Sequence, residues 1–323
     1  SMSSTFKEYL LKSTNSLDSK EIEIIQSLWS GYGKISRYQL IGSSIHSVVV
    51  KCIALENAQK HPRGWNTNYG HQRKVKSYQV ETYWYENWNH RCNDQCKTPH
   101  FLGSYSEGQN QWIILEDLNV VYPLRRYELI IKEVKACLKW LANFHGSFLM
   151  QSPKGLWEVG TYWHLATRPN EFEKIENLEL KAKAHLIDVK LNQCKYQTLV
   201  HGDAKLANFC FSKDSTQIAA VDFQYVGGGC GMKDVAYFLS SCHTSKELEQ
   251  YETELLRYYF SELKQAFQTD KFDFEFTDLE LEWRSLYPYV WADFTRFLLG
   301  WMPTHQKINK YSLKMIQQVL SNL

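Results

Sequence analysis

One short stretch of the sequence limits the possible folds of this chain more than any other. The sequence L-V-H-G-D-A-K-L-A-N-F-C-F at 199–211 sets a polar loop between two apolar, strand-like ends, and V-D-F-Q follows at 221–224 after another apolar run. The polar side chains of this region are, in order, His201, Asp203, Lys205, Asn208 and Asp222. Apolar runs of this length on either side of a turn predict short buried strands, so the fold must display these side chains together.

These residue types suit phosphoryl transfer from Mg-ATP, which needs a base at the acceptor hydroxyl and oxygen ligands for the metal. We expect Asp203 to act as the general base, and Asn208 and Asp222 to hold the metal. Lys205 is predicted to offset charge on the transferring group. His201 is predicted to brace the catalytic loop by hydrogen bonds. The alternative is a polar turn without chemistry.

The pattern resembles the H-R-D-x-x-x-x-N loop and the D-F-G motif of the protein-kinase superfold. Gly202 stands in the place of the Arg and Gln224 in the place of the last Gly. Both departures resemble the small-molecule branch: aminoglycoside phosphotransferases, choline kinases and, most of all, ecdysteroid kinase-like proteins. The resemblance covers about residues 20–300. It implies an α/β (α+β) two-lobed protein-kinase-like fold, with a small N-lobe sheet plus one helix and a larger, mainly helical C-lobe.

A strand lysine and a helix glutamate precede the catalytic loop. Strand-like runs lie at 23–29, 34–41 and 47–55, and Lys51 belongs to the last of them. Residues 73–90 have helical periodicity, with Glu81 on the aromatic face of Tyr78, Tyr85 and Trp88. Because a buried carboxylate needs a partner, we expect Glu81 to pair with Lys51. The resemblance implies that this pair binds the α- and β-phosphates of ATP. The alternative is a solvated lysine and a solvated glutamate.

Two further segments are expected to contact the nucleotide. The S-G-Y-G turn at 30–33 supplies Gly31 and Gly33, whose backbone N–H groups can approach phosphates, although a plain hairpin turn has the same composition. The resemblance implies that W-I-I-L-E-D-L at 112–118 is the hinge between the two lobes. Backbone groups near Glu116 and Leu118 would then form hydrogen bonds with adenine. We therefore expect an N-lobe at 1–118 and a C-lobe at 119–323.

Helical periodicity continues through the second half of the chain. Helices are predicted at about 125–149, 233–268, 275–301 and 306–322, with a kink or break at Pro288. The first has an apolar stripe that includes Ile130 and His145, and His145 is predicted to be a satisfied core histidine. Asp234 resembles the family's helix-start aspartate and is expected to cap the helix and brace the catalytic loop.

Composition and residue positions limit the chemical classes of acceptor that we expect, but they do not identify the acceptor. The resemblance places the acceptor pocket near residues 287–301, where Trp291 and Asp293 lie off the predicted core stripe and are the candidate substrate residues. Aromatic faces beside an acid would suit a cationic head group, as in choline kinases. The net charge of +2 indicates neither a nucleic acid nor a membrane partner. No apolar run is long enough to cross a bilayer.

The eight cysteines show no small-domain disulfide pattern, which is typical of the cytoplasm. One group of metal-ligand types, His90, Cys92, Cys96 and His100, has unusual zinc spacing and leaves a metal site or ordinary loop thiols as alternatives. The sequence as a whole predicts an ATP- and Mg²⁺-dependent kinase of a hydroxyl group on a small organic molecule. A choline- or ethanolamine-type kinase and a nucleotide-binding pseudokinase that acts as an interaction module are the alternatives.

Overall fold

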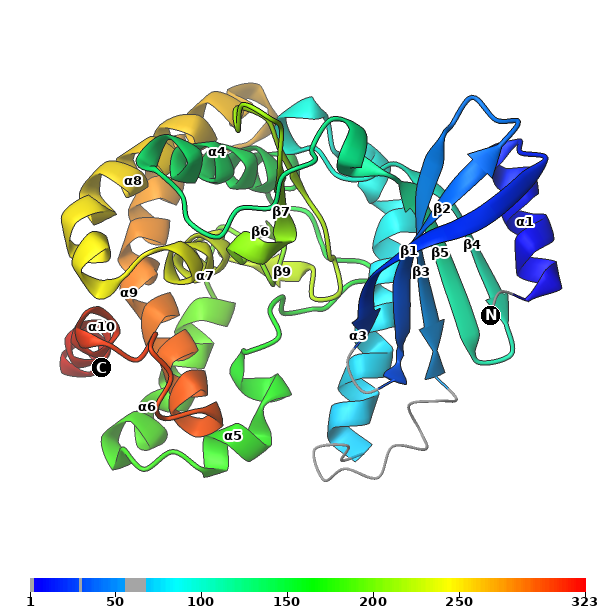
Figure 1. Ribbon diagram of the computed structural model, residues 1–323. Helices are drawn as coiled ribbons and strands as arrows, with labels where there is room; N and C mark the ends of the chain where they lie inside the picture. Colours follow the sequence, from blue (N-terminus) through cyan, green and yellow to red (C-terminus); the bar gives the residue numbers. More distant parts are fainter. Residues whose placement is uncertain (1–2, 29–30, 56–67) are drawn as a thin grey trace. The chain divides into compact units, whose positions relative to one another are not determined.

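The computed structural model describes residues 3–28, 31–55 and 68–323, and they form two compact units. The first unit comprises residues up to 91 together with 98–123, and the second comprises 92–97 and 124–323. Figure 1 shows the helices and strands of both units. Trp29 and Ser30, which end an expected strand and begin an expected turn, lie outside the described residues.

The first unit is built on a five-stranded antiparallel sheet with the strand order β1-β2-β3-β5-β4. Its strands are β1 (Asp18–Leu28), β2 (Gly33–Ile41), β3 (Ser47–Ala54), β4 (Phe101–Glu107) and β5 (Asn110–Glu116). Two helices accompany them, α1 (Ser4–Thr14) and α3 (Asn68–Asn87).

Side-chain alternation along β3 explains why this sheet is covered on both faces. Val48 and Val50 pack into one core cluster with Phe6 and Leu10 of α1. Ile53, of opposite parity, packs into a second cluster with residues that include Tyr78 of α3. Lys51 shares the parity of Ile53, so the alternation turns it to the same face of the sheet as α3.

The second unit is mainly helical and carries two short strand pairs. β6 (Thr198–Val200) pairs with β9 (Gly227–Gly229), and β7 (Phe209–Phe211) pairs with β8 (Ile218–Ala220). The helices are α4 (Ile131–Ser147), α5 (Pro169–Glu173), α6 (Leu178–Asn192), α7 (Met232–Cys242), α8 (Ser245–Ala266), α9 (Phe276–Trp301) and α10 (Lys310–Ser321). The predicted fold class, a small antiparallel sheet followed by a mainly helical region, is confirmed.

Several predicted helix limits are wrong, and local capping explains one of them. The helix expected over 233–268 is two helices, because Thr244 caps α8 in a capping box with Glu247. α4 begins at Ile131, so Ile130 is 64% exposed at its N-terminus instead of lying in the apolar stripe. Pro288 neither ends nor interrupts α9, which runs through it.

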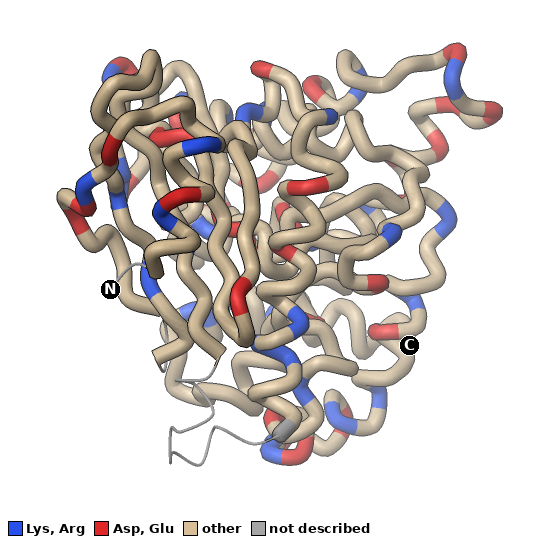
Figure 2. The backbone as a smooth tube through the Cα atoms, turned by 90° about the vertical axis from the view of Figure 1, so that its right-hand side faces the viewer, with Lys and Arg blue, Asp and Glu red and all other residues tan. Residues whose placement is uncertain are grey.

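Charged residues of both signs are interspersed along each unit (Figure 2). This distribution agrees with the small net charge. Among the residues that the structure describes, no helix has the length and apolar composition needed to cross a membrane.

Candidate active site

The loop between β6 and β7 is fixed by hydrogen bonds to one buried carboxylate. Asp234, in the first turn of α7, accepts hydrogen bonds from the backbone N–H of His201 at 2.7 Å and of Gly202 at 3.0 Å. His145 of α4 lies against the same carboxylate, with 2.7 Å between Nε2 and Oδ2, and its Nδ1 is 2.7 Å from the Tyr259 hydroxyl. The predicted brace is therefore present, and His145 is a fully buried, satisfied core histidine.

Asp234 does not cap its own helix as predicted. The residue before α7 is Gly231, and no side chain caps that end. The carboxylate instead supplies its oxygens to the two loop N–H groups, which lie beyond the helix.

Gly202 is required by the path of the loop. Its φ is +86°, in the left-handed region, and a Cβ atom there would lie 2.0 Å from the carbonyl oxygen of Tyr225. No L side chain fits that distance, so the arginine of the protein-kinase motif cannot occupy this position in this backbone. The departure from H-R-D follows from the close packing of the loop on residue 225.

Asp203 lies at the centre of the loop, with its two carboxylate oxygens in different surroundings. Oδ1 accepts a hydrogen bond from the Tyr237 hydroxyl at 2.9 Å, and Oδ2 lies 3.3 Å from the Asn208 amide nitrogen. Burial raises the pKa of the Asp203 carboxyl, and the neighbouring Asp222 carboxylate raises it further, while Lys205, His201 and Tyr237 act in the opposite direction. A carboxylate with a raised pKa is better suited to accept a proton than an exposed one.

Asn208 and Asp222 provide hard oxygen donors of the kind that Mg²⁺ prefers. Asn208 directs its amide nitrogen to the backbone oxygen of Asp203 at 2.8 Å, which leaves its amide oxygen for another partner. The backbone oxygen of Asn208 accepts from the N–H of Val221 at 3.0 Å and so ties the loop to the residue before Asp222. This donor set fits a magnesium ion.

Asp222 has a left-handed backbone conformation. Its φ is +68°, which is uncommon for any residue other than glycine. Gln224 donates from its amide nitrogen to Asp222 Oδ1 at 2.9 Å. The glutamine that replaces the glycine of D-F-G therefore orients the carboxylate two residues before it.

His201 and Lys205 take different positions on the loop. His201 is fully buried, its Nδ1 accepts from the N–H of Asp203 at 3.1 Å, and its Nε2 lies 2.9 Å from the carbonyl oxygen of Val221. It therefore joins the two motifs by hydrogen bonds. Lys205 is exposed. Its charge favours the ionised form of the Asp203 carboxyl.

The structure adds three residues that sequence reasoning missed. Tyr237 donates to Asp203, and its hydroxyl lies 3.0 Å from that of Tyr162. Lys307 places Nζ 5.2 Å from the centroid of the Tyr237 ring. Tyr237 lies in the apolar run V-A-Y-F-L, and the other two lie far from the loop in sequence, so no local signal marked them.

In the first unit, Lys51 and Glu81 form the predicted ion pair. Lys51 Nζ lies 2.5 Å from Glu81 Oε1, and the two side chains are 5% and 2% exposed. The alternative of solvated side chains is therefore wrong. The backbone alternation of β3 and the aromatic face of α3 bring the two charges together at the same side of the sheet.

The residues of the expected turn and hinge have local roles in the first unit, and their contacts with a nucleotide stay a prediction. Gly33, with φ +146°, leaves room for β3, since a Cβ there would lie 1.9 Å from the Cys52 oxygen, whereas Gly31 has open space around it. The Glu116 N–H donates to the His100 carbonyl at 2.9 Å, and the Glu116 side chain accepts from the His100 N–H at 3.0 Å. The Leu118 carbonyl accepts from the Tyr122 N–H at 2.8 Å.

Asp117, between the two hinge residues, is a structural anchor that the sequence did not single out. It accepts from Ser47 at 2.7 Å and from Arg37 at 2.8 Å. Burial alone would raise the pKa of Asp117, but these hydrogen bonds bring it below its ordinary value.

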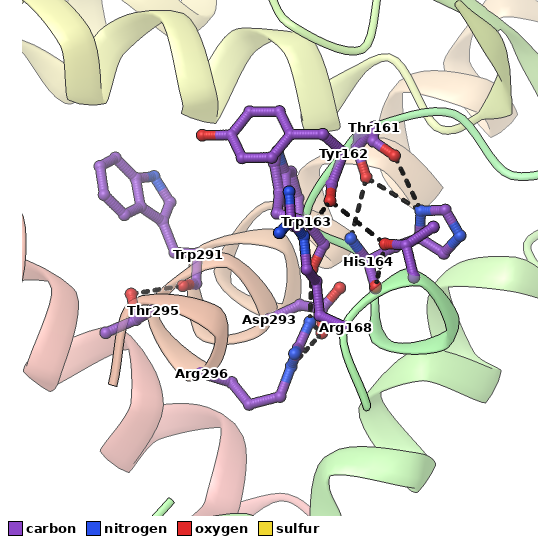
Figure 3. Close-up of polar contacts among 10 residues, drawn as sticks. Thr161, Tyr162, Trp163, His164, Arg168, Trp291, Asp293, Thr295 and Arg296 are labelled. Atoms are coloured by element: carbon purple, nitrogen blue, oxygen red, sulfur yellow. Dashed lines mark hydrogen bonds and ion pairs between the residues drawn. The ribbon is translucent and has the colours of Figure 1, made fainter. Parts of the chain in front are cut away.

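Trp291 and Asp293, the candidate substrate residues, are each 1% exposed. Asp293 pairs with Arg296 at 2.9 Å, and Arg296 also donates to the Trp163 carbonyl at 2.8 Å (Figure 3). The Trp291 indole points away from this pair (Figure 3). It packs edge-on against Tyr311. Their positions off one core stripe do not make them accessible, because α9 is buried on nearly all sides between Leu286 and Leu298.

The group His90, Cys92, Cys96 and His100 shows no metal geometry. Cys96 is buried, with Sγ 3.9 Å from the Ser147 hydroxyl, so it is not a surface-loop thiol. Within the described part of the chain, which includes these four residues, no three His, Cys, Asp or Glu side chains converge on a possible metal position.

The chain can now be compared with known proteins. Residues 158–272 match the model of the ecdysteroid kinase-like family, and this segment contains the H-G-D loop, the D-F-Q motif and Asp234. Over these residues the chain is ecdysteroid kinase-like. The resemblance carried by the two motifs is thereby confirmed. No curated protein matches the chain.

Two solved structures share the fold of this chain. A microcompartment-associated aminopropanol kinase has a TM-score of 0.55 and 14% identity, over 98% of this chain and 94% of its own. An amicoumacin kinase in complex with AMP-PNP, Ca²⁺ and Ami has a TM-score of 0.50 and 11% identity, over 98% of this chain and 92% of its own. At these identities the likeness concerns the fold alone.

Proposed function

We propose that this chain is a kinase that transfers the γ-phosphoryl group of Mg-ATP to a hydroxyl group of a small organic molecule. The observation that carries the proposal is the arrangement at Asp203. A buried carboxylate lies beside the amide of Asn208, faces a hydroxyl donor and is electrostatically coupled to Asp222. A base beside two oxygen ligands is what phosphoryl transfer to an alcohol requires.

The roles follow from the residues. Asp203 orients the acceptor hydroxyl and takes its proton as the acceptor oxygen bonds to the γ-phosphorus and the bond to the ADP oxygen breaks. Asn208 and Asp222 would hold the magnesium ion, which neutralises phosphate charge when bound. We assign Lys51, oriented by Glu81, to the α- and β-phosphates, and Lys205 to the transferring group.

The remaining nucleotide contacts are proposed from backbone groups. Gly31 and Gly33 would lie along the phosphates, and Glu116 and Leu118 would bond the adenine ring through their main-chain atoms. The relative that binds AMP-PNP together with a divalent cation supports this choice of ligands. We propose a small hydroxylated molecule as the partner, and the small net charge of +2 agrees with a partner other than a polyanion.

The test is transfer from γ-labelled ATP into a broad pool of hydroxylated metabolites. We expect a labelled product with the wild type that disappears in Asp222→Asn and on removal of Mg²⁺ with a chelator, since both changes weaken metal binding. Asp214→Asn, an exposed carboxylate bonded only to Ser212 and Thr216, is the matched control and should keep full activity. Mg-ATP binding without any product would favour the pseudokinase instead.

A further inference from the structure

A lysine that the proposed mechanism does not use lies beside the catalytic loop. Lys307 belongs to the segment 302–309 that joins α9 to α10. Its Nζ lies 5.2 Å from the centroid of the Tyr237 ring and 5.5 Å from that of Phe294. Because Tyr237 donates to Asp203, only one side chain separates this ammonium group from the proposed base.

The backbone at Lys307 is fixed by its neighbours. The Lys307 N–H donates to His305 Nδ1 at 3.1 Å, and the Ser312 hydroxyl donates to the Lys307 carbonyl at 2.8 Å. Ser312 is fully buried in the first turn of α10, which Asn309 caps. With its main chain anchored on both sides and its stem half-buried against two rings, Lys307 differs from an ordinary surface lysine.

The ammonium group keeps its capacity to donate hydrogen bonds. Its contacts are the two ring faces, and it forms no ion pair with any carboxylate in the described ranges. Burial lowers the pKa of Lys307 to about 8, the charge of Lys205 lowers it as well, and Asp203 acts in the opposite direction. An ammonium group in these surroundings would gain both a counter-charge and hydrogen bonds from an incoming anion.

The two oxygens of Asp203 distinguish the metal side of the site from the acceptor side. Oδ2 faces Asn208, a proposed metal ligand, whereas Oδ1 faces Tyr237 and, behind it, Lys307. The proposed function puts the acceptor on the side of the carboxylate away from the proposed metal ligand, which is the Oδ1 side. Lys307 therefore lies toward the acceptor.

We call the side chains of Tyr162, Tyr237 and Lys307 the acceptor wall. A second cation, Arg168, lies over part of this wall. Arg168 lies over the rings of Tyr162 and Phe297, at 5.5 and 5.1 Å, although it also pairs with Glu171. The Tyr162 hydroxyl meets that of Tyr237 at 3.0 Å, so the two ring systems are continuous. Because the charge of Arg168 is paired with that of Glu171, the charge that remains on this wall is that of Lys307, which would attract a negatively charged acceptor and repel a positively charged one.

We propose that Lys307 forms an anion-binding subsite for the acceptor, and that the acceptor is a hydroxylated organic acid rather than an amino alcohol. The subsite rests on the proposed function, because the acceptor side is defined by the role of Asp203. Lys307 is a specificity-determining residue in this proposal, and the acid group of the acceptor contacts it while the hydroxyl group faces Asp203.

The first test measures anion binding without turnover. Inorganic sulfate is titrated into protein with ¹³C-labelled lysine ε-carbons, and the Lys307 resonance is assigned from Lys307→Gln. We expect a saturable shift at Lys307, with or without Mg-AMP-PNP, and none at the exposed Lys310 three residues later. Equal, unsaturable shifts at both lysines would overturn the subsite. A Lys307 shift that Mg-AMP-PNP abolishes would assign the residue to the nucleotide.

The second test measures specificity. The metabolite pool is separated by ion exchange into acidic, neutral and basic fractions before transfer from labelled ATP. We expect product from the acidic fraction, and a loss of about tenfold or more in kcat/KM, mainly through KM, in Lys307→Glu but not in Lys310→Glu. Product from the basic fraction, or an unchanged Lys307→Glu, would overturn the proposal. Transfer from no fraction would refute the proposed function, while the sulfate titration would still decide the subsite.

Discussion

At the scale of single residues, the catalytic loop depends on contacts that residue type alone does not reveal. Gly202 is a glycine because the Tyr225 carbonyl occupies the space of a side chain. Gln224 orients Asp222, and Tyr237 fixes one oxygen of Asp203. The motif predicted which side chains gather in the loop, but these supporting partners come from other segments and only the fold identifies them.

The steric role of Gly202 predicts a large loss of stability. Gly202→Ala should lower the free energy of unfolding by about 3 kcal/mol or more, because left-handed strain and a backbone clash add together. Gly108→Ala is the matched control, since its φ is +61° but the space around it is open. It should cost about 1 kcal/mol. Chemical denaturation measures both, and equal losses would contradict the steric explanation.

The lowered pKa of Lys307 predicts a pH dependence of stability. Its folded pKa is about 8 and its ordinary value 10.5, so between these pH values the unfolded chain binds one more proton at this group. Stability must therefore rise with pH in this window. We expect the free energy of unfolding of the wild type to rise relative to that of Lys307→Met between pH 8 and 10. If the unfolding free energies of the two proteins change in parallel with pH, the pKa of Lys307 is not lowered by folding.

At the scale of elements, periodicity located most helices and strands, and capping determined where they end. The strand runs around 34–41 and 47–55 appear almost unchanged as β2 and β3, because alternation toward two covered faces leaves a clear pattern. α9 lies where it was predicted, but the expectation that Trp291 and Asp293 are accessible on it is wrong, because a helix buried on nearly all sides has no single apolar stripe. Helix α1, which covers one face of the sheet, carried no signal that we had recognised.

The buried pair between β3 and α3 predicts a strong effect of removing one charge. Glu81→Gln should lower the free energy of unfolding by about 3–5 kcal/mol, because Lys51 would keep a buried charge without its counter-ion. Glu21→Gln is the control, since its pair with Lys34 has 32% exposed side chains and should cost less than about 1 kcal/mol. Thermal and chemical denaturation measure both variants. Similar losses of unfolding free energy in Glu81→Gln and Glu21→Gln would argue against an effect of the buried charge.

At the scale of the whole molecule, the sequence allowed the fold class to be predicted, and the core of the site stays a prediction that rests on the same motifs. Lys51, Glu81, Asp203, Asn208 and Asp222 occur in the order that the resemblance requires, and two of these pairs are in contact within their own units. The acceptor wall could not be predicted in the same way. It is assembled from the segment near Tyr162, from α7 and from the residues before α10, which are far apart in the chain.

The most direct test of the account is ³¹P NMR of Asp203→Asn beside the wild type, with Mg-ATP and the metabolite pool. We predict that the wild type forms a new phosphomonoester while ADP accumulates. Asp203→Asn should lose at least about 100-fold in the rate of transfer and keep its dissociation constant for Mg-ATP within a few-fold, because the base acts on the acceptor proton. Equal rates of product formation by both proteins would contradict the central claim.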